Sequence, residues 1–307
     1  MKALRLASRG IWVVRNEGWR SFTYKFVEWL KQCVREPRES ERHTAKAEKG
    51  TIITDIKFTA HNIRLDDGTL TKPDRGYSME AYPWSVSARR ILDTVFPGDK
   101  GRFRLADLGC LEGGFAVEFA RMGFQVLGLE VRESNIAACR YVKANTNLPN
   151  LKFVRDDAWN IAKYGTFDAI FCCGLLYHLD RPYYFLKILS AITRRLLIVQ
   201  THFSTQDTND KFHLSEMTEN ESLRGRWYTE FATDEAFSQR EGRKWAAWAN
   251  RRSFWIQREY LLQALQDVGF DLVMEQFDSL GPKMAEELLH GYYRTNSRGT
   301  FIGIKTR

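Results

Sequence analysis

The sequence predicts an α/β protein built on a doubly wound, seven-stranded, mostly parallel sheet. From Leu105 onward, short apolar segments typical of buried strands alternate with segments of helical spacing, the order that crossovers between parallel strands produce. One apolar segment also ends in an acid followed by glycines at 107–114, as at turns between a strand and a helix. The predicted strands are 104–109, 125–130, 151–155, 167–173, 195–202, 270–277 and 299–306, and the predicted helices are 114–122, 134–146, 181–193 and 256–268.

The last two predicted strands are joined by a long connection, which indicates an antiparallel edge rather than another crossover. The segment 203–252 is rich in Trp, Glu and Arg and too long for an ordinary loop, so it is expected to cap the carboxyl ends of the strands. The expected parts are a basic helix and charged linker (1–50), a hairpin and helix preceding the core (51–100), a cofactor-binding core (101–203), a substrate cap (204–252) and the closing part of the core (253–307).

Apolar residues near the N-terminus recur at helical spacing, which predicts an amphipathic helix over 17–34. This helix either docks on the protein or on a second subunit, or attaches to a membrane surface or membrane enzyme. The charged, apolar-poor segment 35–50 is a linker. Further on, Asp66-Asp67-Gly68 is a turn signal between two short predicted strands of a hairpin.

The chain has 307 residues, and its composition favours a cytoplasmic protein. The five cysteines are odd in number, apolar in context and lack metal-ligand spacing, so they are expected to be reduced. The sequence contains no stretch of about 18 apolar residues, so no transmembrane segment is predicted. Residues 17–34 are the candidate for peripheral contact with the inner membrane surface.

The net charge of +8 is concentrated at the N-terminus. Residues 1–50 hold twelve Lys and Arg against six Glu, which leaves a surplus of only two positive charges for the other 257 residues. A broad phosphate-binding face on the globular part is therefore not supported.

The loop LADLGCLEGGF at 105–115 first suggests a phosphate site, because a glycine-rich turn that opens a helix presents free N–H groups. The spacing argues against this. Leu111 stands where a dinucleotide loop needs its second glycine, and no Gly-Lys-Ser or Gly-Lys-Thr follows for a Walker-type loop. The loop is therefore expected to bind a nucleotide-like ligand that places no phosphate there.

This loop resembles the first motif of the class I S-adenosylmethionine-dependent methyltransferases, with one glycine replaced. The resemblance covers about residues 104–203, with 254–306 consistent with the family's closing elements, and implies S-adenosylmethionine as cofactor. It places Asp107 at the ammonium group, Glu130 at the ribose hydroxyls and Asp157 at the adenine, while FDAIFCCGLLYHL at 167–179 would flank the methyl group. The implied cofactor-binding residues are Asp107, Gly109, Cys110, Leu111, Gly113, Glu130, Asp157, Ala158 and Cys173.

A narrower resemblance concerns the segments 173–186 and 253–270. They are similar to the branch containing tRNA wobble-uridine methyltransferases and carboxymethyltransferases, and to bacterial glycan and natural-product methyltransferases, which often carry a stretch like HNIRLDDG at 61–68. The near-neutral body favours a small-molecule or glycan acceptor, with tRNA as the alternative. A cofactor-binding scaffold subunit without catalysis is the alternative from another class.

Methyl transfer to a hydroxyl group needs a general base, and histidine has a suitable pKa. His178 and His202 follow the fourth and fifth predicted strands and are the catalytic candidates, each weighed against a purely structural role. The predicted substrate contacts are Tyr177, Trp227 and Trp255. Trp245 and Trp248 are interpreted as anchors of a cap helix, no metal is expected, and Glu112 has no assigned role.

Overall fold

The computed structural model describes residues 56–207, 211–289 and 297–306, all within one compact unit, Ile56–Arg307. The predicted helix 17–34, the linker 35–50 and the first residues of the predicted hairpin lie outside the described residues. Among the described helices, none is long and apolar enough to cross a membrane.

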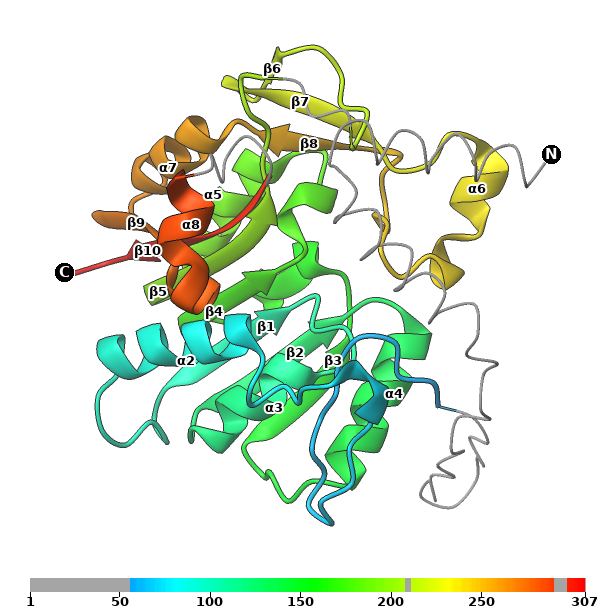
Figure 1. Cartoon of the computed structure of the whole chain (residues 1–307), viewed down its shortest axis with the longest axis vertical. Helices are drawn as coiled ribbons and strands as arrows, with labels where there is room; N and C mark the ends of the chain where they lie inside the picture. The colour runs from blue at the N-terminus through cyan, green and yellow to red at the C-terminus, as the bar shows by residue number, and fades with distance from the viewer. Residues whose placement is uncertain (1–55, 208–210, 290–296, 307) are drawn as a thin grey trace. The chain divides into compact units, whose positions relative to one another are not determined.

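The main sheet has seven strands in the order β3-β2-β1-β4-β5-β10-β9 (Figure 1), which confirms the predicted fold class. Strands β1 to β5 are parallel, whereas β10 runs antiparallel to both β5 and β9, as the long final connection indicated. The strands are β1 (Arg104–Leu108), β2 (Gln125–Glu130), β3 (Leu151–Arg155), β4 (Phe167–Cys173), β5 (Thr193–His202), β9 (Leu272–Gln276) and β10 (Arg298–Ile304).

Helices cover both faces of this sheet. The larger helices are α2 (Pro83–Val95), α3 (Gly114–Arg121), α4 (Glu133–Ala144), α5 (Pro182–Ile192) and α7 (Arg258–Asp267), and the short helical segments are η1 (Pro73–Arg75), η2 (Ala158–Tyr164), η3 (Leu176–His178), α6 (Asp234–Ser238), η4 (Arg240–Gly242), η5 (Asp278–Lys283) and α8 (Met284–Leu289). Helix α2 contacts α3, whereas α5 contacts η2 and α7. Right-handed crossovers place these two groups on opposite faces. The apolar central strands are therefore buried on both sides.

The cap insertion contains a second, three-stranded antiparallel sheet. Its strands are β6 (Thr218–Asn220), β7 (Leu223–Thr229) and β8 (Arg252–Ile256). Strand β8 contacts η3, so this sheet is anchored beside the end of β4. The prediction of a cap helix around Trp245 and Trp248 is wrong, because 244–250 has no helical structure.

The predicted hairpin is reduced to a tight turn in its described part. Arg64 and Leu70 form a single antiparallel bridge, and the Leu65 N–H donates to the Thr69 carbonyl. Gly68 adopts a φ of 86° at the turn, a conformation that glycine allows. The turn signal is therefore confirmed, but this part does not extend into two strands.

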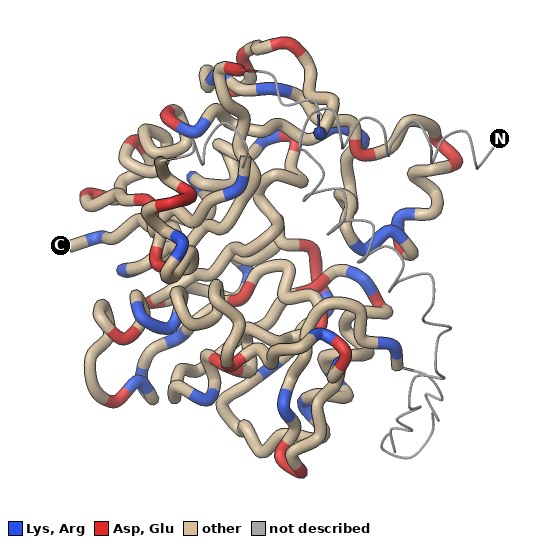
Figure 2. The backbone as a smooth tube through the Cα atoms, viewed as in Figure 1, with Lys and Arg blue, Asp and Glu red and all other residues tan. Residues whose placement is uncertain are grey.

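Because β1 to β5 are parallel, their carboxyl ends meet at one edge of the sheet, and the antiparallel β10 begins there: Arg298 pairs with His202. This edge gathers residues from five strands. Over the described chain, basic and acidic residues are interspersed rather than gathered by sign (Figure 2).

Candidate active site

A cavity of about 450 Å³ opens at this edge of the sheet. It is lined by residues that follow β1, β2, β3 and β4, by the start of β10, and by segments from the N-terminal side of the core and from the cap. The predicted site residues that line it are Asp107, Gly109, Cys110, Leu111, Glu130, Asp157, Ala158, Cys173, Tyr177 and His178. Gly113, His202, Trp227 and Trp255 are not among its lining residues.

Asp107, at the end of β1, is almost completely buried. Its Oδ2 atom has no hydrogen-bond partner within the described structure. Burial raises the pKa of this carboxyl to about 8, with a smaller opposing effect from a hydrogen bond to the Ala116 backbone. A cationic donor at Oδ2 would remove this penalty.

Glu130 ends β2 and holds the glycine loop in place. Its Oε2 accepts from the Leu111 N–H at 3.0 Å, and its Oε1 accepts from the N–H groups of Val131 and Arg132 at 2.9 and 2.8 Å. Burial nevertheless raises its pKa. A carboxylate has about four acceptor positions, so three donors leave room for one more.

The two acids after β3 have different surroundings. Asp156 accepts hydrogen bonds at both oxygens from the Asp157 N–H, the Asn160 amide and the Tyr164 hydroxyl. Asp157 accepts from the Trp159 N–H at Oδ1 and caps η2. Asp157 thus accepts fewer hydrogen bonds from the described protein than Asp156 does, and its choice as the ligand contact stays a prediction.

Gly113 has a packing role. Its φ is 84°, and a Cβ atom there would lie 2.6 Å from the Phe153 ring, so only glycine fits between the loop and β3. Leu111 also has a positive φ, 54°, which is unusual for a branched residue. Its N–H donates to Glu130 and its carbonyl accepts from the Cys139 thiol, and both bonds hold this conformation.

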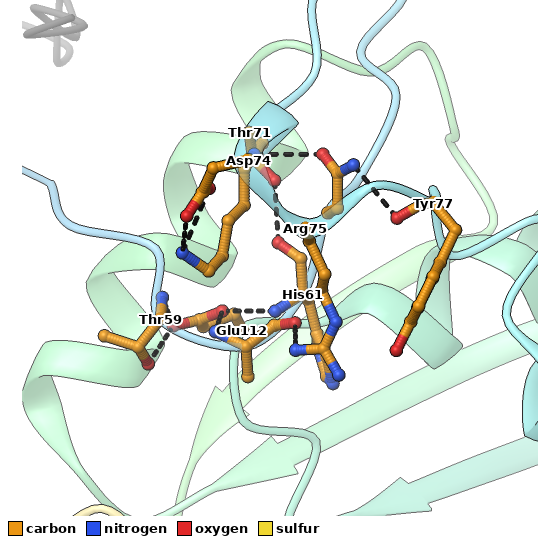
Figure 3. Close-up of polar contacts among 10 residues, drawn as sticks. Thr59, His61, Thr71, Asp74, Arg75, Tyr77 and Glu112 are labelled. Carbon is orange, nitrogen blue, oxygen red and sulfur yellow. Dashed lines mark hydrogen bonds and ion pairs between the residues drawn. The ribbon is translucent and has the colours of Figure 1, made fainter. Parts of the chain in front are cut away.

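Glu112, whose role the sequence left open, binds the chain that precedes the core (Figure 3). Its Oε1 accepts from the Thr59 N–H and hydroxyl at 2.6 and 2.8 Å, and its Oε2 accepts from the N–H groups of Ala60 and His61 at 3.0 and 2.8 Å. Burial opposes ionisation, but the electrostatic interaction with the adjacent His61 ring and these donors hold the pKa of Glu112 below its usual value. Glu112 is therefore a carboxylate clamp.

The clamp positions two further groups at the cavity wall, His61 and Arg75. The Gly114 N–H at the start of α3 donates to His61 Nδ1 at 2.9 Å, so the neutral ring carries its proton on Nε2. Burial lowers the pKa of His61 to about 4, so the ring is neutral near pH 7. Arg75 donates to the Ala60 carbonyl and lies beside His61 and Glu112 (Figure 3).

His178, on η3, is paired with an acid from the cap. Its Nδ1 lies 2.7 Å from Glu230 Oε1, and the Glu230 side chain is 1% exposed. The Ser253 hydroxyl and the Ala247 N–H also donate to Glu230. Since an ionised carboxylate only accepts, His178 donates through Nδ1, and in the neutral form of the ring Nε2 is then the acceptor.

The other predicted catalytic histidine, His202, does not line the cavity. His202 contacts the Tyr177 ring edge-to-face and stacks on Trp255. Its Nδ1 lies 3.1 Å from the Ser297 carbonyl, which requires Nδ1 to be the donor. Burial, reinforced by Arg298, lowers the pKa of His202 to about 3, which disfavours it as a base near pH 7.

The two predicted substrate tryptophans belong to the small sheet. The Trp255 indole N–H donates to the Tyr177 carbonyl at 3.0 Å, and the side chain is buried. Trp227 packs against Phe254 and lies beneath the Arg252 guanidinium. Both therefore support η3 and the cap rather than the cavity wall, whereas Tyr177 lines the cavity itself.

The cap contributes a segment that we call the strap, residues 244–250, to the cavity wall. Arg132, two residues beyond Glu130, donates to the carbonyls of Arg243, Ala246 and Ala247 through Nη2. Its guanidinium also lies 5.5 Å from the Trp248 ring centroid. One side chain thus joins the end of β2 to the strap.

A family model described as a methyltransferase domain matches residues 83–275, which include β1 to β5, the cap and β9. The chain belongs to the methyltransferase domain family. This confirms the resemblance to class I S-adenosylmethionine-dependent methyltransferases at the level of family and fold.

A curated relative and two solved structures are similar to this chain. A curated relative from Geobacillus sp. (strain WCH70), "Putative methyltransferase GWCH70_2453", is 33% identical over 85 residues, covering 27% of this chain and only 34% of the relative's length. Among solved structures, the N-terminal domain of EvdMO1 with SAH bound is 23% identical with a TM-score of 0.52, covering 71% of this chain and 80% of that one. The same domain in the presence of SAH and D-fucose is 22% identical with a TM-score of 0.53, covering 73% of this chain and 83% of that one.

Sequence reasoning missed several residues of the methyltransferase cavity. Arg132 lies two residues after Glu130, the acid that ends the predicted strand 125–130, and this position could have drawn attention to it. Glu230 and Arg298 carry no local motif, because their neighbours in space come from distant segments. Among the described residues, no group of three or more His, Cys, Asp or Glu side chains is arranged to hold a metal ion.

Proposed function

We propose that this protein is an S-adenosylmethionine-dependent O-methyltransferase that acts on a hydroxyl group of a small molecule or glycan precursor. The cofactor would lie across the ends of β1, β2 and β3, and the acceptor across the ends of β4 and β10. The observation that carries the proposal is that His178 lines the cavity and is paired with the buried Glu230. A hydroxyl acceptor loses a proton during methyl transfer, and this pair is arranged to take it.

The residues at the cofactor end fit S-adenosylmethionine. The buried, unpartnered Oδ2 of Asp107 suits the ammonium group, and the remaining acceptor position of Glu130 suits a ribose hydroxyl. Asp157 and Ala158 line the cavity where adenine would follow the ribose. Gly109, Cys110, Leu111 and Cys173 would form the wall against the methionine portion.

The carboxylate of the methionine portion also needs donors. Arg75 and the Nε2–H of His61 line the same cavity, and both are positioned through the Glu112 clamp. We assign them to this carboxylate. Asp107 and Arg75 would then recognise the two opposite charges of an amino acid.

When bound, S-adenosylmethionine supplies a methyl group activated by a positively charged sulfur. His178 would take the proton of the acceptor hydroxyl at Nε2, so that the acceptor oxygen can receive the methyl group that the cofactor supplies. Glu230 would stabilise the resulting imidazolium, and in the neutral ring it fixes the tautomer that has its proton on Nδ1. The products are a methyl ether, S-adenosylhomocysteine and one proton on His178.

This function is tested by incubating the protein with cell extract and isotopically labelled S-adenosylmethionine, with product formation followed by mass spectrometry. His178→Gln retains a donor for Glu230 but removes the base, so we expect the rate to fall at least about 100-fold. The affinity for S-adenosylhomocysteine should not change.

His202→Gln is the matched control, because His202 lies outside the cavity, and its rate should stay near that of the wild type. The proposal fails if His178→Gln retains full activity, or if a protein that binds the cofactor methylates nothing in any extract fraction.

A further inference from the structure

The acceptor end of the cavity contains a cation that the proposed methyl transfer does not use. Arg298 is the first residue of β10, and antiparallel pairing with His202 brings it to the edge where β4 and β5 end. It lines the cavity together with Gly174, Tyr177 and His178. Its position next to the proposed base makes it a candidate for acceptor recognition.

The Arg298 guanidinium is held in a defined plane. Its Nε and Nη2 donate to one oxygen of the Gln200 amide at 3.0 and 2.8 Å. The group lies 4.6 Å from the Trp84 ring centroid and 5.7 Å from that of Tyr177. A Cβ atom at Gly174 would lie 3.5 Å from Nη2, so the guanidinium lies next to the end of β4.

Carboxylates are distributed unevenly along the cavity. The carboxylates that line it are Asp107, Glu130, Asp156 and Asp157. All four belong to the ends of β1, β2 and β3, where the cofactor is proposed to lie. Within the described lining, the acceptor end presents Arg298, His178 and aromatic rings instead, including Tyr82 and Trp84 from the start of α2.

We propose, on the basis of the proposed function, that the acceptor carries an acidic group, a carboxylate or a phosphate, which Arg298 binds while the hydroxyl to be methylated faces His178. An arginine guanidinium binds both kinds of anion through charge-assisted hydrogen bonds. Trp84 and Tyr82 provide faces against which the apolar side of a sugar ring can pack. The chemical class is therefore an acidic sugar, either a sugar acid or a sugar phosphate.

The test is calorimetric titration of the full chain, saturated with S-adenosylhomocysteine, with three probes: glucuronate, glucose 1-phosphate and glucose. At least one of the two anions should bind about tenfold or more tightly than glucose, as expected for a charge-assisted pair. The stronger anion shows whether the acidic group is a carboxylate or a phosphate. Equal binding of all three probes would overturn the proposal.

Two variants test whether Arg298 is the residue that binds the anion. Arg298→Gln should lose at least about tenfold in affinity for the preferred anion and keep its affinity for S-adenosylhomocysteine. Arg195→Gln removes a charge from the opposite end of β5 and should change neither. Unchanged anion binding in Arg298→Gln contradicts the assignment.

Two further outcomes are distinguishable. If Arg298→Gln fails to fold, the comparison of the three probes on the wild type still decides whether the site prefers an anion. If the wild type does not bind S-adenosylhomocysteine, the proposed function fails. Cofactor binding without anion preference contradicts only this inference.

Discussion

At the scale of single residues, Asp107 links cofactor binding to pH. Its pKa of about 8 means that the free protein holds this carboxyl largely protonated at pH 6 to 7, because burial disfavours the charge. A bound ammonium group requires the ionised form. The affinity for S-adenosylhomocysteine should therefore rise as the pH increases from 6 to 8, by up to about tenfold per pH unit.

Calorimetry across this range measures the effect, and Asp107→Asn is the control that should remove the slope. His61 and His202 have pKa values of about 4 and about 3 and titrate below this window. A flat pH profile in the wild type would contradict the ammonium assignment of Asp107.

Glu112 shows how a residue beside a ligand loop can serve the fold. In Glu112→Gln one oxygen becomes an NH2 group that faces backbone N–H donors. At least one buried donor is then unsatisfied, so we expect the free energy of unfolding to fall by about 1–3 kcal/mol. Urea denaturation measures this loss.

The matched control is Asp74→Asn, which removes a charge from the surface pair with Lys72 and should change stability by less than about 0.5 kcal/mol. Equal stability of the two variants would mean that Glu112 does not clamp the segment Thr59 to His61.

At the scale of elements, the strap depends on Arg132. Arg132→Met keeps an unbranched apolar stem but removes the donors to the strap carbonyls of Ala246 and Ala247 and to the neighbouring carbonyl of Arg243. We expect S-adenosylhomocysteine to dissociate about tenfold faster, because the strap would cover the cavity less of the time. Stopped-flow fluorescence follows this rate.

Arg140→Met provides the comparison, since Arg140 lies on α4, the helix that begins directly after Arg132, and pairs with Glu133 at the surface. Its dissociation rate should match that of the wild type. An unaltered rate in Arg132→Met would show that the strap does not retain the ligand.

At the scale of the whole molecule, the compact unit contains every lining residue of the cavity, from Ala60 to Arg298. A protein of residues 56–307 should therefore fold and bind S-adenosylhomocysteine within about twofold of the full chain, since the Glu112 clamp begins at Thr59. Calorimetry on both proteins tests this. Loss of binding on truncation would assign residues 1–55 a part in the site.

Much of the fold could be predicted because its evidence is local. Each parallel strand is a continuous apolar run, and the acid or glycine that ends it is adjacent in sequence, as at Asp107 and Glu130. The small sheet of the cap was not predicted, because its strands are short and its pairing joins Trp227 to Phe254 across 27 positions. Such pairing depends on contacts rather than on a repeating pattern.

By itself, the sequence determined the doubly wound sheet, the family resemblance and the cofactor end of the cavity, where ligand groups follow directly after strands. Only the tertiary structure decided which histidine faces the cavity, since His178 meets its acid 52 residues away. It also placed Arg298 beside that histidine through antiparallel pairing with β5. The physical reason is that a strand end is specified by neighbouring residues, whereas a pair of side chains is specified by the packing of the elements that carry them.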